Sequence, residues 1–239
     1  VCYAGAPLGS YSSERNYPTK NLVKIPKEIS FDIAATVMTK GLTAFYLLHK
    51  TYPVLSTDIL LFHAAAGGVG MIACQWLKQK GATVIGTVGS DEKAEIAKTH
   101  GCDHPIIYSR ENFAKRVMEL TDGEGVPVVY DGVGASVHDG SLACLARFGT
   151  YVNFGAASGH IPPVPGTALA ARALYFTRPG LAPHTATRDL TLEIANYLFN
   201  AVREGVKIEI NHNYELRNAV EAHRALEARA TTGSTVFSV

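Results

Sequence analysis

The order of apolar and polar positions divides most of the chain into alternating strands and helices. Five apolar runs have the length of strands, at residues 58–63, 83–88, 105–108, 127–131 and 150–155. Segments with a helical pattern separate them, at 68–80, 91–100, 112–121 and 138–146. Continuous apolar strands that alternate with helices are typical of βαβ units around a parallel sheet. The pattern therefore predicts a doubly wound α/β domain, the Rossmann fold.

The two ends of the chain depart from this alternation. Residues 1–28 hold short β-like pieces broken by Gly, Pro and Ser, and a helix is predicted over 31–49, with Gly41 as its weak point. After a sixth strand at 173–178, the pattern predicts a helix (188–204), a strand (206–214), a helix (216–228) and a last strand at 234–239. We expect the two termini to build a second, smaller unit together.

Composition narrows the possible functions. The chain has 239 residues, of which 47% are apolar and 18% charged, and its net charge is +1. Such a balance provides no broad field for nucleic acid or an acidic membrane. No apolar run approaches the roughly 18 residues of a membrane helix. The four cysteines form no CxxC pair and have no histidine at zinc-ligand spacing, which favours free thiols in the cytoplasm and no metal site.

The turn after the first predicted strand has the pattern of a phosphate-binding loop. In "HAAAGGVG" (63–70), Ala65, Gly67 and Gly70 take the three glycine positions of G-x-G-x-x-G, between a strand and a helix. Gly67 would let the backbone approach a pyrophosphate, and the free N–H groups of the first helical turn would face the anion. An apolar stripe on this helix, Val69, Ile72, Ala73, Trp76 and Leu77, would face the sheet. Inside five βα units we predict dinucleotide binding; the alternative is a tight turn without a ligand.

The end of the second strand indicates which dinucleotide. An NAD site usually has an acid there, bonded to the ribose 2′-hydroxyl, but this strand ends in Gly89, followed by Ser90 and Lys93. A small residue with a hydroxyl and an ammonium nearby suits a 2′-phosphate, so we predict NADPH rather than NADH. Asp91 could instead point at the ribose or favour the helix dipole, and Lys93 could be a solvated helix residue.

Several segments together resemble a known family. "KGLTAFYLLHKTYPV", "HAAAGGVGMIACQWLKQKGATVIGTVGS", "VVYDGVG", "FTRPG" and "RATTGS" resemble quinone oxidoreductases of the zeta-crystallin type, in the medium-chain dehydrogenase/reductase superfamily. The resemblance implies the end of an N-terminal catalytic domain with its linking helix (1–39), a Rossmann domain (40–180), and a segment that returns to the catalytic domain (181–239). It implies remnants of a mostly β, GroES-like domain and an N-terminally truncated member, with weak NADPH binding and little quinone reductase activity.

The resemblance also implies a set of cofactor contacts, while the catalytic residues stay unknown. In "FGAAS", Ala156 stands where relatives often carry Asn. With the glycine turn and the 2′-phosphate pocket, the predicted NADPH contacts are Tyr46, Gly67, Gly68, Val69, Gly89, Ser90, Lys93, Tyr108, Val133, Gly155, Ala156, Ala157, Ser158, Phe176, Thr177, Arg178 and Arg229.

The predicted function is a zinc-free transfer of electrons or hydride from NADPH to quinones. The stretch "AATVMTKGLTAF" has no cysteine for the catalytic zinc of related alcohol dehydrogenases. One alternative is an NADPH-dependent reductase of α,β-unsaturated carbonyls (alkenals or enones) on the same scaffold. Another is a non-enzymatic NADPH- or RNA-binding protein, against which the low net charge argues. The apolar strand at 173–178 reads as a sheet edge, so we expect a homodimer.

Overall fold

The computed structural model describes residues 1–5, 7–228 and 230–239. The chain forms two compact units, one of residues 46–180 and one of residues 1–45 with 181–239.

A six-stranded sheet forms the centre of the 46–180 unit. Its strands are β1 (Ile59–His63), β2 (Thr83–Val88), β3 (His104–Ile107), β4 (Val126–Asp131), β5 (Leu145–Asn153) and β6 (Tyr175–Thr177). They lie in the order β3-β2-β1-β4-β5-β6, and every neighbouring pair is parallel. The strand order reverses between β1 and β4, so the predicted doubly wound fold is confirmed.

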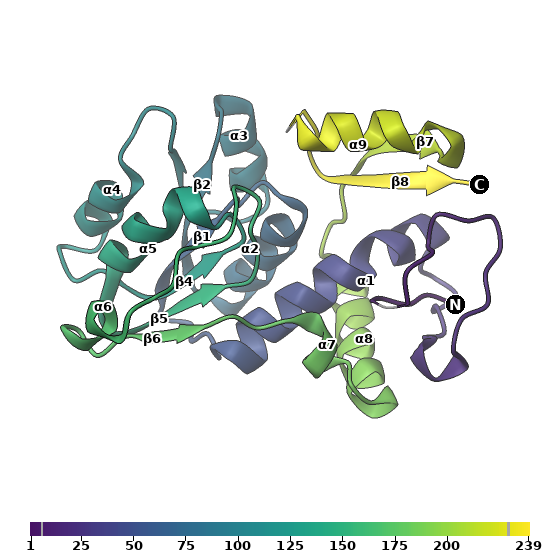
Figure 1. The fold of residues 1–239 in the computed structure, drawn as a ribbon, viewed down its shortest axis with the longest axis horizontal. Helices are drawn as coiled ribbons and strands as arrows, with labels where there is room; N and C mark the ends of the chain where they lie inside the picture. Colours follow the sequence, from purple (N-terminus) through teal and green to yellow (C-terminus); the bar gives the residue numbers. More distant parts are fainter. Residues whose placement is uncertain (6, 229) are drawn as a thin grey trace. The chain divides into compact units, whose positions relative to one another are not determined.

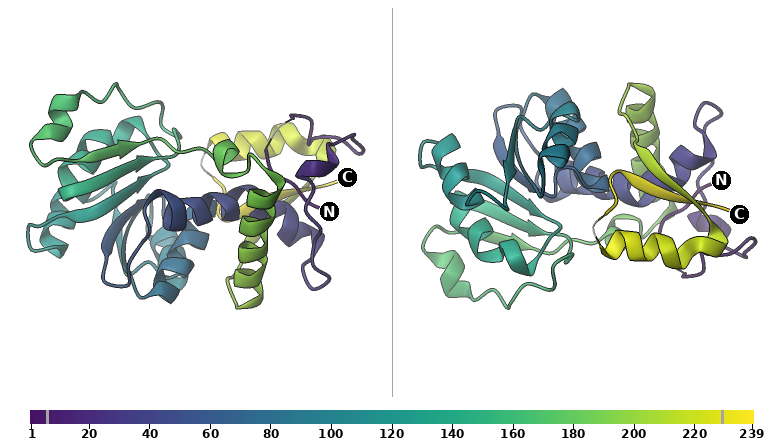
Figure 2. Two further views of the ribbon diagram at one scale, coloured as in Figure 1. Left: turned by 90° about the horizontal axis from the view of Figure 1, so that it is seen from below. Right: turned by 90° about the horizontal axis from the view of Figure 1, so that it is seen from above.

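Helices cover both faces of this sheet (Figure 1 and Figure 2). One face carries α2 (Gly68–Lys80) and α3 (Asp91–Thr99); the other carries α4 (Phe113–Leu120), η3 (Ala135–Val137) and α5 (His138–Cys144), and α6 (Gly166–Ala170) precedes β6. The core on the α4 and α5 side contains Leu61, Ile85, Ile106, Val117, Val129, Cys144 and Tyr151, all at most 2% exposed. In α2, Ile72, Ala73, Trp76 and Leu77 are buried as predicted, but Val69 is half-buried.

The predicted start of β5 was wrong. Helix α5 ends at Cys144, not at residue 146, and β5 begins at Leu145 rather than at residue 150. The Arg172 guanidinium donates to the carbonyl oxygens of Leu142 (2.5 Å) and Ala143 (3.2 Å). These contacts satisfy carbonyl groups that the end of a helix leaves unpaired, so α5 can end early.

The second unit is built from both termini. It contains η1 (Thr19–Asn21), most of α1 (Phe31–Tyr46), α7 (Leu181–His184), α8 (Arg188–Arg203), β7 (Ile210–Glu215), η4 (Leu216–Asn218), α9 (Ala219–Glu227) and β8 (Ser234–Ser238). β7 and β8 pair in parallel, and an isolated bridge joins Cys2 to Val23. Gly41 marks a close approach of helices, because a Cβ there would lie 2.4 Å from Cδ1 of Leu198 in α8.

The length and apolar character of one helical stretch were underestimated from the sequence. α1 continues into the π-helical turn η2 (Leu47–Thr51), and Phe31–Thr51 is long and apolar enough to cross a membrane by length and composition. However, 61% of its most apolar window is buried inside the protein. Burial of this extent is what the core helix of a globular protein shows.

Candidate cofactor-binding site

The candidate site lies at the carboxyl ends of the six parallel strands. In doubly wound sheets, ligands bind outside these ends where the strand order reverses, here between β1 and β4. The turn after β1 holds the glycine motif, Gly89 follows β2, Tyr108 follows β3, and Val133 follows β4. The fold thus brings predicted residues from distant parts of the sequence to one edge of the sheet.

The glycine turn leaves no room for side chains. Gly67 caps α2 and donates its N–H to the Ala64 carbonyl oxygen at 2.8 Å. A Cβ at Gly70 would lie 2.4 Å from that same oxygen, and one at Gly86 in β2 would lie 2.6 Å from the Ala65 Cβ. The turn therefore packs tightly on β2, and α2 begins directly after it at Gly68, where the free N–H groups of a first helical turn can receive a phosphate group. Gly86 was not predicted, since its partner is 21 positions away.

Tyr108 explains why the second strand ends in glycine. A Cβ at Gly89 would lie 2.8 Å from the Tyr108 hydroxyl oxygen and 3.3 Å from Cζ of its ring. Any side chain at this position would have to move the tyrosine, so the glycine gives the Tyr108 side chain its room. These two predicted residues lie together.

Ser90 and Asp91 already have partners in the protein. The Ser90 hydroxyl accepts a hydrogen bond from the Lys93 backbone N–H at 3.3 Å and caps α3. The Asp91 carboxylate is bound by both terminal nitrogens of Arg110, with Nη1 to Oδ1 at 2.8 Å. The arginine lowers the pKa of Asp91 from its ordinary value. Arg110 was not predicted; its place two residues after Tyr108 is the only signal in the sequence.

A buried carboxylate organises the loops after β4 and β5. Asp131 is 0% exposed. Its Oδ1 accepts the backbone N–H groups of Val133 (2.7 Å) and Gly134 (2.8 Å). Its Oδ2 accepts the Tyr151 hydroxyl (2.6 Å) and the Asn153 amide (2.8 Å). Four donors thus satisfy a carboxylate that would otherwise be costly to bury, and they fix the turn that carries Val133.

Ser158 and Arg178 join the neighbouring loops. The Ser158 hydroxyl donates to the Val133 carbonyl oxygen at 2.9 Å and accepts the Ser136 N–H at 3.0 Å. The Arg178 guanidinium binds the Asn153 side-chain oxygen and lies 3.4 Å from the Gly155 carbonyl oxygen. The side chain of Ser158 therefore holds two loops together.

The remaining predicted cofactor contacts differ in burial and in position. Phe176 is half-buried against Tyr151, and Ala156 is half-buried beside the exposed Ala157. Gly68 and Val69 open α2, and Thr177 ends β6. Tyr46 ends α1 and is 2% exposed, so its ring offers little surface. Arg229 lies outside the described residues.

His63 is buried directly before the glycine turn. Its two ring nitrogens lie 2.9 Å from the Thr87 and Ser141 hydroxyl oxygens. Burial lowers the pKa of His63 to about 4, so the ring is neutral at pH 7. Its full burial and its two partners make it a structural residue.

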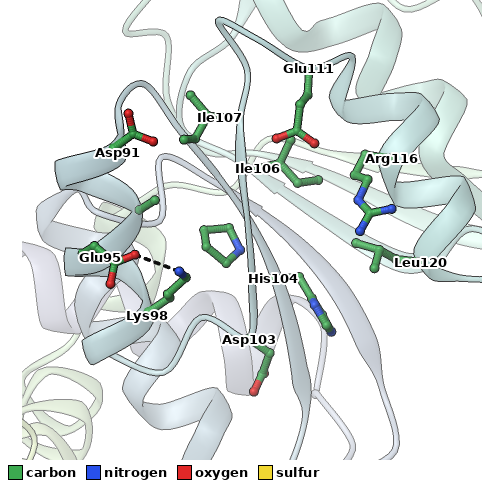
Figure 3. Close-up of a pocket in the computed structure, with 12 residues that line it drawn as sticks. Asp91, Glu95, Lys98, Asp103, His104, Ile106, Ile107, Glu111, Arg116 and Leu120 are labelled. Carbon is green, nitrogen blue, oxygen red and sulfur yellow. Dashed lines mark hydrogen bonds and ion pairs between the residues drawn. The ribbon is translucent and has the colours of Figure 1, made fainter.

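A separate pocket lies beside β3. It has a volume of about 260 Å³ and lies between α3, β3 and α4 (Figure 3). Its lining mixes Glu95, Lys98, Glu111 and Arg116 with apolar side chains, and Glu95 and Lys98 pair at 2.7 Å. Of the predicted cofactor contacts it contains none. In the described part of the chain, no group of three or more His, Cys, Asp or Glu residues could hold a metal ion.

Known proteins similar to this chain agree with this geometry. Residues 68–180 match the family model of the zinc-binding dehydrogenases. The chain is 48% identical to a quinone oxidoreductase of Pseudomonas aeruginosa and 44% identical to a 2-haloacrylate reductase of a Burkholderia species. These alignments cover 99% of the chain and 74% and 73% of the two relatives. The crystal structure of Escherichia coli quinone oxidoreductase complexed with NADPH superposes with a TM-score of 0.96, at 44% identity, over 99% of this chain and 74% of that one.

The fold and the glycine-lined edge define a dinucleotide-binding oxidoreductase of the medium-chain dehydrogenase/reductase superfamily. Within it, the chain belongs to the quinone oxidoreductase family.

Proposed function

We propose that the protein is an NADPH-dependent, zinc-free reductase of quinones. The observation that carries the proposal is the glycine turn at the carboxyl end of β1, which packs closely on β2 through Gly70 and Gly86 and begins α2 after Gly67. Such a strand–turn–helix arrangement suits the pyrophosphate of a dinucleotide. The identity of 48% to a quinone oxidoreductase supports the choice of substrate.

The residues of the chain would bind and orient the cofactor. The N-terminus of α2 would receive the pyrophosphate through Gly67, Gly68 and Val69. Gly89, Ser90, Lys93 and Tyr108 would surround the 2′-phosphate. Val133, on the turn fixed by Asp131, would line the adenosine path. Bound NADPH would supply the hydride, and a quinone accepts it without needing a strong acid from the protein.

The nicotinamide half of the cofactor would meet the loops after β5 and β6. Their predicted contacts are Gly155, Ala156, Ala157, Ser158, Phe176, Thr177 and Arg178. Because Arg178 and Asn153 bind each other, these loops are held in a common arrangement before any ligand enters.

A second substrate class is supported by one specific likeness. The 2-haloacrylate reductase of the Burkholderia species is 44% identical over nearly the whole chain, and the 2-haloacrylate in its name is an activated alkene. Reduction of α,β-unsaturated carbonyls by the same site is therefore the alternative. The net charge of +1 argues against the RNA-binding alternative.

Three finer points belong to the same proposal. We place the protein in the cytoplasm, since its four cysteines are buried free thiols. We assign residues 40–180 to the nucleotide domain, and residues 1–39 and 181–239 to the flanking parts. We expect a homodimer, formed through the β6 edge.

The test is to titrate NADPH and NADH by fluorescence and to assay quinones and enones on the same preparation. NADPH should bind more tightly than NADH. Lys93→Ala should weaken NADPH about tenfold or more, because a charge-assisted contact of about 1.5–3 kcal/mol is lost, and should leave NADH nearly unchanged. Lys98→Ala, on the same helix and paired with Glu95, is the matched control and should change neither.

Two results would contradict the proposal separately. Equal weakening of both cofactors by Lys93→Ala would remove this lysine from the 2′-phosphate pocket. Enone turnover equal to or above quinone turnover would replace the quinone by the alternative substrate class.

A further inference from the structure

An ion pair lies close in sequence to the residues proposed to surround the 2′-phosphate, and its acid, Asp91, also lines the pocket beside β3. Asp91 is the first residue of α3, directly after Ser90, and its carboxylate is drawn at the start of that helix in Figure 3. Arg110 follows Tyr108 by two residues. The guanidinium binds both carboxylate oxygens, with one contact at 2.8 Å, and so bridges the segments that end β2 and β3.

The pair contributes little to folding. The side chains of Arg110 and Asp91 are 61% and 66% exposed, and exposed ion pairs typically add little to stability. The two segments are also joined independently by packing, since the Tyr108 ring covers Gly89, and the Tyr108 N–H donates to the Val88 carbonyl oxygen at 3.1 Å. The ion pair is therefore not required to hold the pocket together.

The ion pair matters more for the charge that a bound ligand would meet than for folding. Residues 89–93 contain two acids, Asp91 and Glu92, and Asp91 is the nearer in sequence to Gly89, where NAD sites carry their ribose-binding acid. Unpaired, its charge would repel a 2′-phosphate and favour a 2′-hydroxyl. Paired with Arg110, the charge is balanced, while a guanidinium with five N–H donors keeps three for a further anion.

We propose that the Asp91–Arg110 pair determines the preference for a 2′-phosphorylated cofactor. Arg110 masks the repulsive carboxylate and presents its remaining N–H groups to the 2′-phosphate, beside Lys93. This inference rests on the proposed NADPH function and adds a specificity-determining pair to that site.

The test uses only the adenosine half of the cofactor, so it does not depend on the substrate. Adenosine 2′,5′-bisphosphate and AMP are titrated calorimetrically into the wild type and into Arg110→Ala, Asp91→Asn and the double variant. Arg110→Ala should weaken the bisphosphate about tenfold or more and leave AMP within about twofold. Asp91→Asn should preserve or strengthen bisphosphate binding. The double variant should regain part of the loss, because the unmasked charge is gone.

The controls separate charge from structure. Arg110→Lys keeps the charge but not the two-pronged geometry and should lie between wild type and Arg110→Ala. Arg116→Ala removes an arginine that pairs with Glu119 on α4 and should change neither ligand. The Arg110→Ala effect should shrink as ionic strength rises.

The outcomes distinguish this inference from the proposed function. A wild type that binds the bisphosphate no better than AMP overturns the NADPH preference, and this inference with it. If the wild type prefers the bisphosphate to AMP but Arg110→Ala changes the binding of neither ligand, as expected for Arg116→Ala, this inference is wrong and the NADPH preference stands. Equal loss of both ligands in Arg110→Ala, or a double variant no better than that single one, would show that Arg110 only supports the loop.

Discussion

At the scale of single residues, His63 makes stability depend on pH. It is 0% exposed, and burial lowers its pKa from the ordinary 6.5 to about 4. The unfolded chain therefore takes up a proton below pH 6.5 that the folded chain refuses until about pH 4. The stabilising contribution is complete above pH 6.5 and is lost as pH falls toward 4, at about 1.4 kcal/mol per pH unit.

Urea unfolding at pH 7 and pH 5 measures this contribution. The drop in unfolding free energy between the two should be about 2 kcal/mol smaller in His63→Gln than in the wild type. Equal drops in the wild type and His63→Gln would mean that the folded protein protonates this ring readily.

Single residues of the site also differ in whether the sequence alone could reveal them. Gly67, Gly70 and Gly89 were predicted because their reason is local, in a strand–turn–helix pattern with a missing acid. Asp131 could not be recognised in this way. Two of its donors come from Tyr151 and Asn153, about twenty positions later, and only the folded sheet brings them to the carboxylate.

At the scale of secondary structure elements, prediction worked best where an element ends on its own residues. Helix α2 spans Gly68–Lys80 as predicted, because Gly67 begins it and Gly81, with φ of 85°, ends it. The start of β5 was missed because Arg172, 27 positions after Leu145, binds the carbonyl groups at the end of α5. An ending set by a distant side chain leaves no local signal.

Gly41 shows how the packing of two elements changes the expected effect of a substitution. In an exposed helix, Gly→Ala stabilises by about 1 kcal/mol. Here the new Cβ would lie 2.4 Å and 2.8 Å from the two Cδ atoms of Leu198. We expect Gly41→Ala to destabilise the protein by about 1–3 kcal/mol, as overpacking does, measured by urea unfolding.

A second substitution tests the cause. Leu198→Ala alone leaves a cavity, but combined with Gly41→Ala it should cost less than the sum of the two single changes. Gly166→Ala, with nothing within 4 Å of the new Cβ, should be neutral or stabilising. Additive costs would show that α1 relaxes away from α8 and that contact with Leu198 is not the reason.

At the scale of the whole molecule, the two edges of the large sheet are not equivalent. At one edge, β3 carries Pro105, which has no N–H to donate, and mixed charges line the adjoining pocket. At the other edge, β6 exposes Tyr175 (61%), and Phe148 near the start of β5 is 62% exposed. Proline and charge discourage pairing at β3, whereas the aromatic β6 edge suits a second copy of the chain.

We therefore expect a homodimer in which β6 meets its counterpart across a two-fold axis. Tyr175→Lys places a charge on that edge and should shift sedimentation at micromolar concentration from dimer toward monomer. Leu55→Lys is the matched control, because Leu55 is equally exposed (62%) but lies in the loop before β1. A wild type that sediments as a monomer would remove the proposed interface, and a Tyr175→Lys variant as dimeric as Leu55→Lys would move it to another face. The residues proposed to surround the 2′-phosphate (Gly89, Ser90, Lys93, Tyr108 and Arg110) lie at β2, β3 and α3, and β3 and β6 are opposite edges of the sheet. Dissociation of the dimer should therefore leave the binding of adenosine 2′,5′-bisphosphate unchanged.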